Sequence, residues 1–405
     1  MSALFNLFYI YDPWLFHFFR MAFFTGVVAC LALAYKAYKK QLTKGIFVPV
    51  DSIVVILSLI GVSIIPVLLH GTKDFSVVFM YCKTLILFIF GLGIYNLFYF
   101  NQQGSQRIIK DLKIGIVVQA VIGFVALAGL PFMIDLALST NIVLPRFYGS
   151  EQEYRLYNLT SMAFFQLSAF YLMLLHFLLS YNSREKENGY INSIFLFLLL
   201  FIGLISGRTF LLLSVVSILI YFNWRYIPSL LLFAGICVFL AHEYSDNRYV
   251  YHALEPLINI IKVVETGQDL DSLSDLSSST DTLVQHHLYM PEIKQILAGD
   301  GYYFYPEGGY YGKTDSGFLR QTLYGGFAYL IACFLFTAYF VYRIAQNWFA
   351  GSWKFILSTL AILSVLNIKA DTYAFPGIML VLLMFLSLFG TTGRIKVFFC
   401  NQGQN

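Results

Sequence analysis

Charged residues are scarce in this 405-residue chain: Asp, Glu, Lys and Arg make up 12% of it, whereas they form about a quarter of an ordinary soluble domain. This scarcity, together with 59% hydrophobic residues, excludes a typical soluble globular protein. Apolar runs of about 17 to 25 residues recur along the whole sequence, and such a run is long enough to cross a bilayer as a helix. The runs do not alternate polar and apolar residues as barrel strands do. We therefore predict an all-α, polytopic integral membrane protein.

Cysteine is rare as well, with five residues in the chain. Four lie within apolar runs and Cys400 lies in the tail, so the predicted external loops contain none, which excludes a disulfide framework or a Cys/His metal site there. A P-loop and a GxGxxG fingerprint are also missing, which argues against a nucleotide as the direct substrate. We predict neither a metal nor a cofactor. The net charge of +4 comes mostly from loops between spans and does not indicate nucleic-acid binding.

The apolar runs predict about eleven membrane spans, and residues 3–10 allow a twelfth that is broken at Asp12-Pro13. The predicted spans cover roughly residues 14–34, 47–69, 76–100, 114–138, 159–179, 191–206, 209–222, 226–241, 321–342, 354–368 and 376–390. They divide the chain into three parts. Spans 1 to 8 occupy residues 1–240, a large polar loop occupies 241–320, and the remaining spans and a short tail occupy 321–405.

Lysine and arginine follow every second span, beginning with Lys36, Lys39 and Lys40 after the first. Because cytoplasmic loops of membrane proteins retain such residues, these connections are predicted to be cytoplasmic. The large loop, residues 139–157 and the break at Gly207-Arg208 then share the external side with the N-terminus. No basic segment followed by a cleavage site opens the chain, so we expect no removable signal peptide.

Two arginines are candidate anion ligands on the external side. Arg208 lies in a Ser-Gly-Arg sequence between two apolar spans and has no acidic neighbour in sequence. It is either an interfacial arginine whose head reaches water or a phosphate ligand, since a guanidinium fits phosphate oxygens. Arg155 leads into the fifth span and is the better candidate of its segment. Arg146 is also there, and Glu151 and Glu153 offer both arginines ordinary structural partners.

The end of the large loop supplies the other candidates. Asp315 stands at the start of the ninth span, where it either caps a helix or acts as a general base toward a sugar hydroxyl. His286 and His287 are alternative bases, polar ligands or simply solvated loop residues. Aromatic residues precede Asp315 and either contact sugars or pack the loop onto the membrane interface. They include Tyr302, Tyr303, Tyr310 and Tyr311.

Three of these features, in this order, resemble the O-antigen polymerase and O-antigen ligase superfamily. They are an arginine before a middle span (Arg155), a Ser-Gly-Arg between two spans (Arg208), and a large external loop with a characteristic end. That end reads Gly-Asp-Gly, a short polar motif, a leucine and a Gly-Gly pair. In this sequence it comprises Gly299, Asp300, Gly301, Thr314, Asp315, Leu319, Gly325 and Gly326. The resemblance covers about residues 146–330 and the number of spans.

The resemblance implies a membrane-embedded, GT-C-like glycosyltransferase that is inverting and independent of metal. Its substrates would be oligosaccharides on undecaprenyl pyrophosphate, joined at the periplasmic face of a bacterial inner membrane in lipopolysaccharide biosynthesis. A chain-length regulator and a flippase of the same pathway would be its partners. By position, the resemblance assigns Arg155 and Arg208 to the pyrophosphate, with Arg320 as a helper, and Asp315 to the base.

The sequence departs from the family at two places. Ligases usually carry a histidine at the start of the last motif, where Thr314 stands here, which favours a polymerase over a ligase. An arginine expected in the middle of the loop and an RX10G spacing are also missing. A ligase remains an alternative, as does a flippase or other transporter, for which Lys83 and His176 are the deep ionisable candidates. Convergence of Arg155, Arg208 and Asp315 on one external cavity would favour the transferase.

Overall fold

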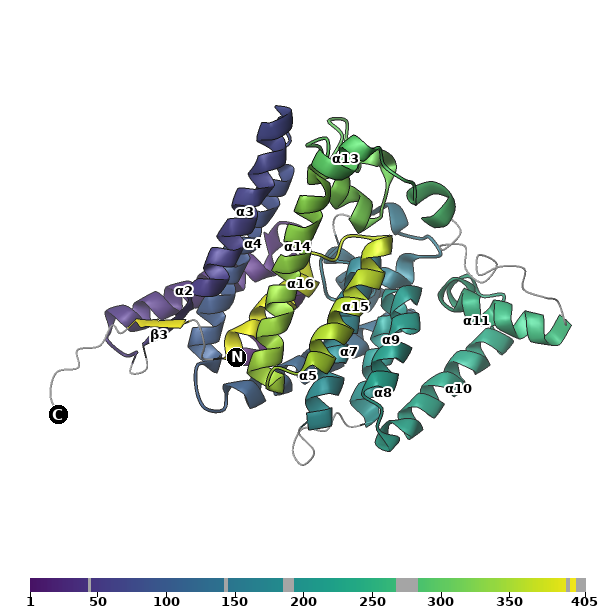
Figure 1. The fold of residues 1–405 in the computed structure, drawn as a ribbon. Coiled ribbons are helices and arrows are strands. Elements are labelled where there is room, and N and C mark those ends of the chain that lie inside the picture. The colour runs from purple at the N-terminus through teal and green to yellow at the C-terminus, as the bar shows by residue number, and fades with distance from the viewer. Residues whose placement is uncertain (43–44, 142–144, 185–192, 267–282, 391–393, 398–405) are drawn as a thin grey trace.

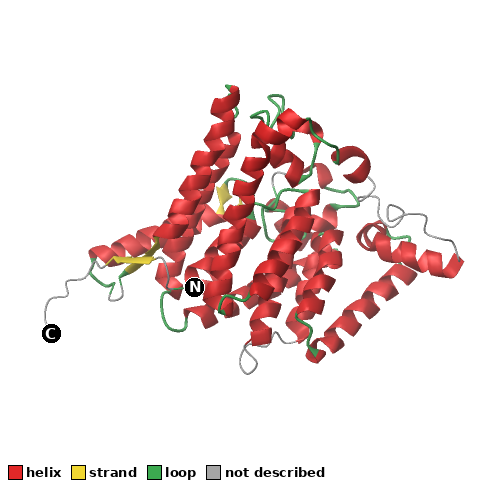
Figure 2. Cartoon of the chain, in the orientation of Figure 1, coloured by secondary structure: helices red, strands yellow, loops and turns green. Residues whose placement is uncertain are grey.

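The computed structural model describes residues 1–42, 45–141, 145–184, 193–266, 283–390 and 394–397. Helices dominate this part of the chain (Figure 2), and six of them are long and apolar enough to cross a membrane. These are α2 (Met21–Tyr38), α3 (Val50–His70), α4 (Ser76–Ile94) with its π-helical extension (Tyr95–Tyr99), α7 (Phe164–Arg184), α10 (Ile227–Glu243) with the turn before it (Trp224–Tyr226), and α14 (Gly317–Phe349). The chain is therefore a helical membrane protein, as predicted.

The other described helices are shorter or more polar. The apolar ones are α1 (Ser2–Tyr11), α8 (Ser193–Ser206), α9 (Arg208–Ile220) and α16 (Ile378–Leu386), which leads into the turn Ser387–Phe389. The remaining helices are α5 (Gly104–Leu127), α6 (Pro131–Ser139), α11 (Arg248–Thr266), α13 (Ile293–Ala298) and α15 (Trp353–Lys369). Most of the eleven predicted spans thus have a helix, but in the described residues only six helices meet the length and hydropathy of a span by themselves.

The first predicted span begins later than expected. Residues 14–20 form a hairpin of β1 (Trp14–Leu15) and β2 (Phe19–Arg20), so that α2 starts only at Met21. Asp12 ends α1 in a left-handed conformation, and Pro13 provides no N–H to continue the helix. The Asp12 carboxylate then pairs with Arg20 and accepts a hydrogen bond from the Ala22 N–H at 3.0 Å. This closes the hairpin.

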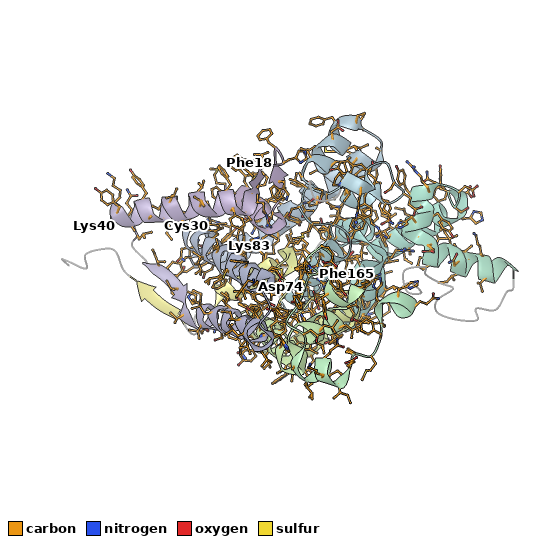
Figure 3. The ribbon with its side chains drawn as sticks, turned by 90° about the horizontal axis from the view of Figure 1, so that it is seen from above. Phe18, Cys30, Lys40, Asp74, Lys83 and Phe165 are labelled. Atoms are coloured by element: carbon orange, nitrogen blue, oxygen red, sulfur yellow. The ribbon has the colours of Figure 1, made fainter. Side chains whose placement is uncertain are left out.

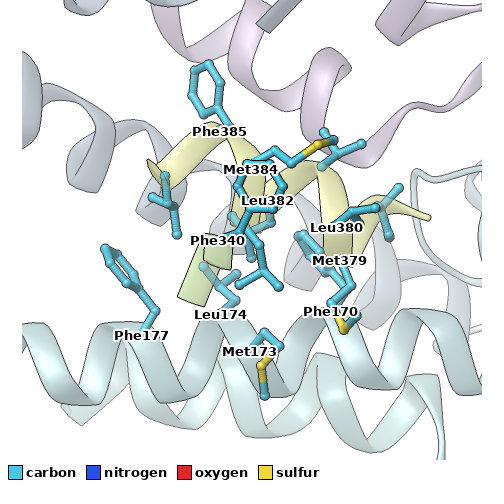
Figure 4. Close-up of a cluster of buried hydrophobic side chains, with 14 of the residues drawn as sticks. Phe170, Met173, Leu174, Phe177, Phe340, Met379, Leu380, Leu382, Met384 and Phe385 are labelled. Carbon is cyan, nitrogen blue, oxygen red and sulfur yellow. The ribbon is translucent and has the colours of Figure 1, made fainter. Parts of the chain in front are cut away.

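Helix α7 forms the centre of the molecule. Its side chains are buried on nearly all faces, which is typical of a helix surrounded by other helices. Phe170, Met173, Leu174 and Phe177 of α7 pack against α16 and against Phe340 of α14 (Figure 4). A second, small sheet pairs β3 (Ile46–Pro49) with β4 (Arg394–Val397). Because α7 is enclosed in this way, the position of its N-terminus at Phe164 is firmly set.

The described end of the large loop, residues 283–316, is docked on the helices; its residues 267–282 lie outside the described part of the chain. It lies with α13 at the same end of the molecule as the turn between α3 and α4 (Figure 1). Thr72 of that turn donates to the Gly301 carbonyl at 2.8 Å, and the Asp74 carboxylate accepts from the N–H of Tyr303 at 2.7 Å. Asp74 lies near the centre of the molecule in the view from above (Figure 3).

Two glycine motifs fasten the loop to α14. The helix is kinked at Gly325 and Gly326, which frees carbonyl groups in the preceding turn. The N–H of Asp300 donates to the Leu323 carbonyl at 2.7 Å, and that of Gly301 donates to the Tyr324 carbonyl at 3.0 Å. Gly326 has a φ of +71°, and a Cβ on it would overlap the carbonyl of Leu297 in α13. The Gly-Asp-Gly and Gly-Gly motifs thus have a structural role, the docking of the loop.

Replacing Gly326 by alanine is expected to destabilise the protein by about 2 kcal/mol or more, because a Cβ is unfavourable at this φ and collides with α13. Thermal unfolding of the purified protein measures the effect. Gly235→Ala in α10 is the control, since open space surrounds that Cβ position. Equal melting temperatures for the two variants would contradict the docking role of Gly326.

Candidate functional site

A cavity of about 540 Å³ lies where the loop meets the ends of α7, α9 and α15. This volume is in the range of small-molecule binding sites. Arg155, Arg208 and Asp315, which are far apart in sequence, all line it; we call it the cationic cavity. Its lining residues are Glu151, Gln152, Arg155, Phe164, Phe165, Ser168, Gly207, Arg208, Thr209, His252, Leu283, His287, Asp315, Lys369 and Ala370. Phe165 lies near the middle of the molecule in Figure 3.

Arg208 is placed by the break between α8 and α9. Gly207 allows this break to pack closely on α7, since a Cβ there would lie 2.7 Å from the Ser168 hydroxyl oxygen. The hydroxyls of Ser168 and Ser206 are hydrogen-bonded at 3.1 Å and hold the two helices together. Arg208 then begins α9, and its side chain is 12% exposed.

The Arg208 guanidinium forms an ion pair with Glu255 of α11, a helix kinked at Leu254. A largely buried arginine requires such a counter-charge. The sequence around Arg208 contains no acidic residue, so this partner comes from the tertiary structure. The simple interfacial role considered for Arg208 therefore does not describe its surroundings, since the charge lies in a cavity with a carboxylate beside it.

Arg155 lies in the short helical turn Glu153–Leu156. Its guanidinium lies 5.4 Å from the ring centre of Phe164 and contacts Tyr154 and His252. Within the described residues, no carboxylate lies at ion-pair distance from it. The expected pairing with Glu153 does not form, because Glu153 accepts hydrogen bonds from Tyr157 at 2.6 Å and from the Gly149 N–H.

Arg146 lies outside the cavity. Its guanidinium packs over the ring of the adjacent Phe147 at 4.8 Å from the ring centre. In the described part of the chain it makes no ion pair, so the pairing with Glu151 or Glu153 expected for it is absent. Of the two arginines in this segment, only Arg155 faces the site.

His252 was not singled out in the sequence, yet it lines the cationic cavity and contacts Arg155. Its Nδ1 lies 3.0 Å from the Tyr154 hydroxyl and 3.5 Å from a guanidinium nitrogen of Arg155. Burial and then the charges of Arg155 and Arg208 lower the pKa of His252 to about 3, so the imidazole is neutral at physiological pH. Because a guanidinium only donates, Nδ1 is the accepting nitrogen and the ring proton is on Nε2.

Lys369 is the second residue missed from the sequence. It is the last residue of α15, just beyond the predicted span 354–368, and its ammonium lies 3.4 Å from the Thr209 hydroxyl. Burial, followed by the charges of Arg208 and Arg155, lowers its pKa to about 8. A signal was present in the sequence: a lysine at the end of a span that was predicted to be external departs from the usual cytoplasmic bias of basic residues.

Asp315 lines the same cavity as Arg155 and Arg208. Its side chain is 55% exposed, and its carboxylate is 3.7 Å from Nε2 of His287, whose Nδ1 contacts the Lys313 carbonyl at 3.2 Å. The cap position of α14 is Ser316, and among the described residues no backbone N–H of α14 donates to Asp315. The capping role considered for Asp315 is therefore absent. His287 lines the cavity beside it, whereas His286 is exposed and does not.

Arg320 has a different role from the one expected. It does not line the cationic cavity; its side chain is 4% exposed and pairs with Asp371 at 3.1 Å. The guanidinium also lies 3.3 Å from the ring centre of Tyr310, and the Tyr303 hydroxyl donates to Asp371. Arg320 thus joins α14, the loop and the segment after α15, and in the structure it does not face the cavity for which it was proposed as a pyrophosphate helper.

Replacing Arg320 by methionine should destabilise the protein by about 3 to 5 kcal/mol, because the buried Asp371 carboxylate loses its counter-charge. Thermal unfolding measures this loss. Adding Asp371→Asn to Arg320→Met should restore much of the stability, since no buried charge is then left unpaired. Activity per folded molecule should also return in the double variant. A double variant that folds but is inactive would indicate that Arg320 acts on the substrate directly.

The four tyrosines proposed as sugar contacts do not line the cationic cavity. Tyr303 is buried beneath the loop, and Tyr311 donates to Asp300 at 3.0 Å while its ring contacts that of Tyr302. Tyr310 covers the Arg320 guanidinium. Packing of the loop accounts for Tyr302, Tyr303 and Tyr311, while Tyr310 also borders a second cavity.

The described residues contain no group of three or more His, Cys, Asp or Glu side chains arranged to hold a metal ion. The cationic cavity is instead built from arginine, lysine, histidine and carboxylate groups. Searches of protein-family models, of curated proteins and of solved structures give no match to this chain, so the function is argued from the site itself.

Proposed function

We propose that this protein is a membrane-embedded glycosyltransferase of the O-antigen polymerase type, acting on oligosaccharides linked to undecaprenyl pyrophosphate at the periplasmic face of the inner membrane. One observation carries the proposal: Arg155, Arg208, Lys369 and Asp315 line a single cavity. Such a set provides cations for a phosphate leaving group and a carboxylate for an incoming hydroxyl.

The positive charges of the cationic cavity favour the binding of an anion. Arg155 and Arg208 provide planar guanidinium groups, which bind phosphate oxygens in pairs, and Lys369 adds a third cation. The N-termini of α7 and α9, at Phe164 and Arg208, also border the cavity and add partial positive charge. The Glu255 carboxylate neutralises part of the positive charge of Arg208 in the structure. A bound pyrophosphate would compete with Glu255 for the guanidinium.

In the proposed reaction, the acceptor hydroxyl oxygen attacks the anomeric carbon of the donor sugar from the side of Asp315. The bond from that carbon to the phosphate oxygen breaks, and undecaprenyl pyrophosphate leaves with the bonding electrons. The hydroxyl proton passes to the Asp315 carboxylate, and the configuration at the anomeric carbon is inverted. Arg155, Arg208 and Lys369 stabilise the charge that develops on the leaving phosphate.

A transporter has less support. Of its two deep candidates, His176 is hydrogen-bonded to Ser217 at 3.1 Å and to Ser358 at 2.8 Å, as a buried structural histidine is. Lys83 is exposed on α4 (Figure 3). A ligase would use the same cavity and the same transfer chemistry with a different acceptor.

The direct test is to incubate the purified protein with its lipid-linked repeat unit. A ladder of longer lipid-linked products together with released undecaprenyl pyrophosphate is the expected result. Transfer only to a lipid A core acceptor would identify a ligase. If no glycosidic bond forms with either acceptor, the proposed transferase function is wrong.

Lys369 makes anion binding dependent on pH. Its pKa of about 8 means that the ammonium is charged below pH 8 and loses its proton as the pH rises through that value. Inorganic pyrophosphate should therefore bind several-fold more weakly at pH 9 than at pH 7, since one of three cations is lost. Calorimetry of Lys369→Arg, which stays charged, should show a smaller change over this range. An equal change in both proteins would exclude Lys369 as the titrating group.

A further inference from the structure

A second cavity, of about 650 Å³, also has Asp315 in its lining. We call it the loop cavity, because the segment 305–315 alone lines it. Its lining residues are Tyr305, Glu307, Gly308, Gly309, Tyr310, Lys313, Thr314 and Asp315. Asp315 is the only lining residue that the loop cavity shares with the cationic cavity, among the residues described. The carboxylate can therefore be reached from both sides.

The concave shape of the loop cavity is fixed by local hydrogen bonds. The Tyr305 N–H donates to the Gly309 carbonyl at 3.0 Å, and the Gly308 N–H donates to the Tyr305 carbonyl at 3.0 Å. Gly308 and Gly309 have φ values of +97° and +88°, which side-chain-bearing residues rarely adopt. This tight turn opposes Lys313 and Asp315 across the cavity.

Two tyrosine rings on the wall are held in place. Tyr310 lies between the Arg320 guanidinium, 3.3 Å from its ring centre, and the ring of Phe304. The Tyr305 hydroxyl accepts a hydrogen bond from the Gly312 N–H at 3.2 Å. The buried Arg320–Asp371 pair thus supports this wall from below. A rigid wall binds a flexible ligand without a further ordering cost for the protein.

The charges distinguish the two cavities. The cationic cavity has three cations, Arg155, Arg208 and Lys369, against the carboxylates of Glu151 and Asp315. The loop cavity has one cation, Lys313, against the carboxylates of Glu307 and Asp315. Neither Glu307 nor Lys313 forms an ion pair within the described residues, so both are available for hydrogen bonds. A cavity with an excess of carboxylate disfavours phosphate, whereas carboxylate, ammonium and tyrosine together fit the hydroxyl groups of a neutral sugar.

We propose that the loop cavity binds the glycan of the acceptor, so that the attacking hydroxyl reaches Asp315 from this side while the donor pyrophosphate occupies the cationic cavity. This inference rests on the proposed transferase function, and it assigns donor and acceptor to opposite sides of one carboxylate. Glu307 and Lys313 are then specificity residues for the acceptor, with no contact to the phosphates.

The test measures two ligands on the purified full-length protein: the oligosaccharide repeat unit released from its lipid by mild acid, and inorganic pyrophosphate. Glu307→Gln/Lys313→Gln should weaken oligosaccharide binding about tenfold through the loss of charge-assisted hydrogen bonds, and leave pyrophosphate binding unchanged. Arg155→Ala should do the reverse. The matched control is Glu243→Gln/Lys294→Gln, which removes the same charges from exposed positions on α10 and α13.

Equal oligosaccharide affinity in the two double variants would overturn the inference, and so would displacement of the oligosaccharide by pyrophosphate. The kinetics separate the two proposals. If the wild-type protein polymerises and the double variant keeps its KM for the acceptor, the loop cavity is not the acceptor site although the transferase stands. If the wild-type protein forms no glycosidic bond but its oligosaccharide binding depends on Glu307 and Lys313, the glycan site stands and the transferase fails.

Discussion

Replacing Arg208 by lysine is expected to reduce polymer formation about 100-fold or more, although the positive charge is kept. Lysine can still pair with Glu255, but its single ammonium cannot offer two parallel N–H groups to a phosphate. The fold should be retained, because the ion pair and the start of α9 remain. The rate of release of undecaprenyl pyrophosphate by the purified variant, relative to the wild-type protein, measures the effect.

The control for Arg208→Lys is Arg146→Lys. Arg146 lies in the same segment as Arg155 but packs on Phe147 and does not line the cationic cavity. Its replacement should leave the product ladder unchanged. Wild-type rates for Arg208→Lys would remove Arg208 from the phosphate site and leave it as the structural partner of Glu255.

Asp315→Asn is expected to lower turnover by about 10² to 10⁴, the usual contribution of a general base, because an amide cannot take the proton of the acceptor hydroxyl. Stability should change little, since Asp315 is 55% exposed and Ser316, not Asp315, holds the cap position of α14. Pyrophosphate should still bind, because the cations are untouched. Single-turnover measurements with lipid-linked donor and thermal unfolding of the same preparation provide both readouts.

Asp246→Asn is the matched control for Asp315→Asn, since Asp246 is an exposed carboxylate beyond the end of α10. Near-normal turnover of Asp315→Asn would reject Asp315 as the base. His287 would then be the next residue to test, because its Nε2 lies 3.7 Å from that carboxylate and the side chain lines the same cavity.

The sequence pointed to several residues that line the cationic cavity, but not to all of them. Arg155, Arg208, Asp315 and His287 were all identified as candidates, and they line one cavity. The ion pair of Arg320 was not foreseen, because its partner, Asp371, lies 51 residues further along the chain, between α15 and α16. His252 was missed because nothing in the sequence sets it apart within the polar segment 241–320, whereas the unusual position of Lys369 at the end of a predicted span was overlooked.

The glycine motifs also could be recognised in the sequence, but their structural role could not. Their order was recognisable in the sequence and was taken as a sign of function. In the structure, Gly299 and Gly326 allow α13 to lie against α14, and the N–H groups of Asp300 and Gly301 bind carbonyls freed by the kink. These glycines therefore serve the chemistry indirectly, by holding the segment that carries Asp315.

By itself, the sequence determined local features of the structure, namely the helices and the points at which they end. Long apolar runs form helices because a backbone surrounded by hydrocarbon must satisfy its own hydrogen bonds, and breaks such as Asp12-Pro13 end them by sterics and by a missing donor. Only the tertiary structure decided which charged side chains form ion pairs. The pairs Arg208–Glu255 and Arg320–Asp371 join residues on different elements, and packing around α7 brings Lys369 beside Arg208. A buried charge takes the partner that helix packing places next to it, and no local pattern encodes that distance.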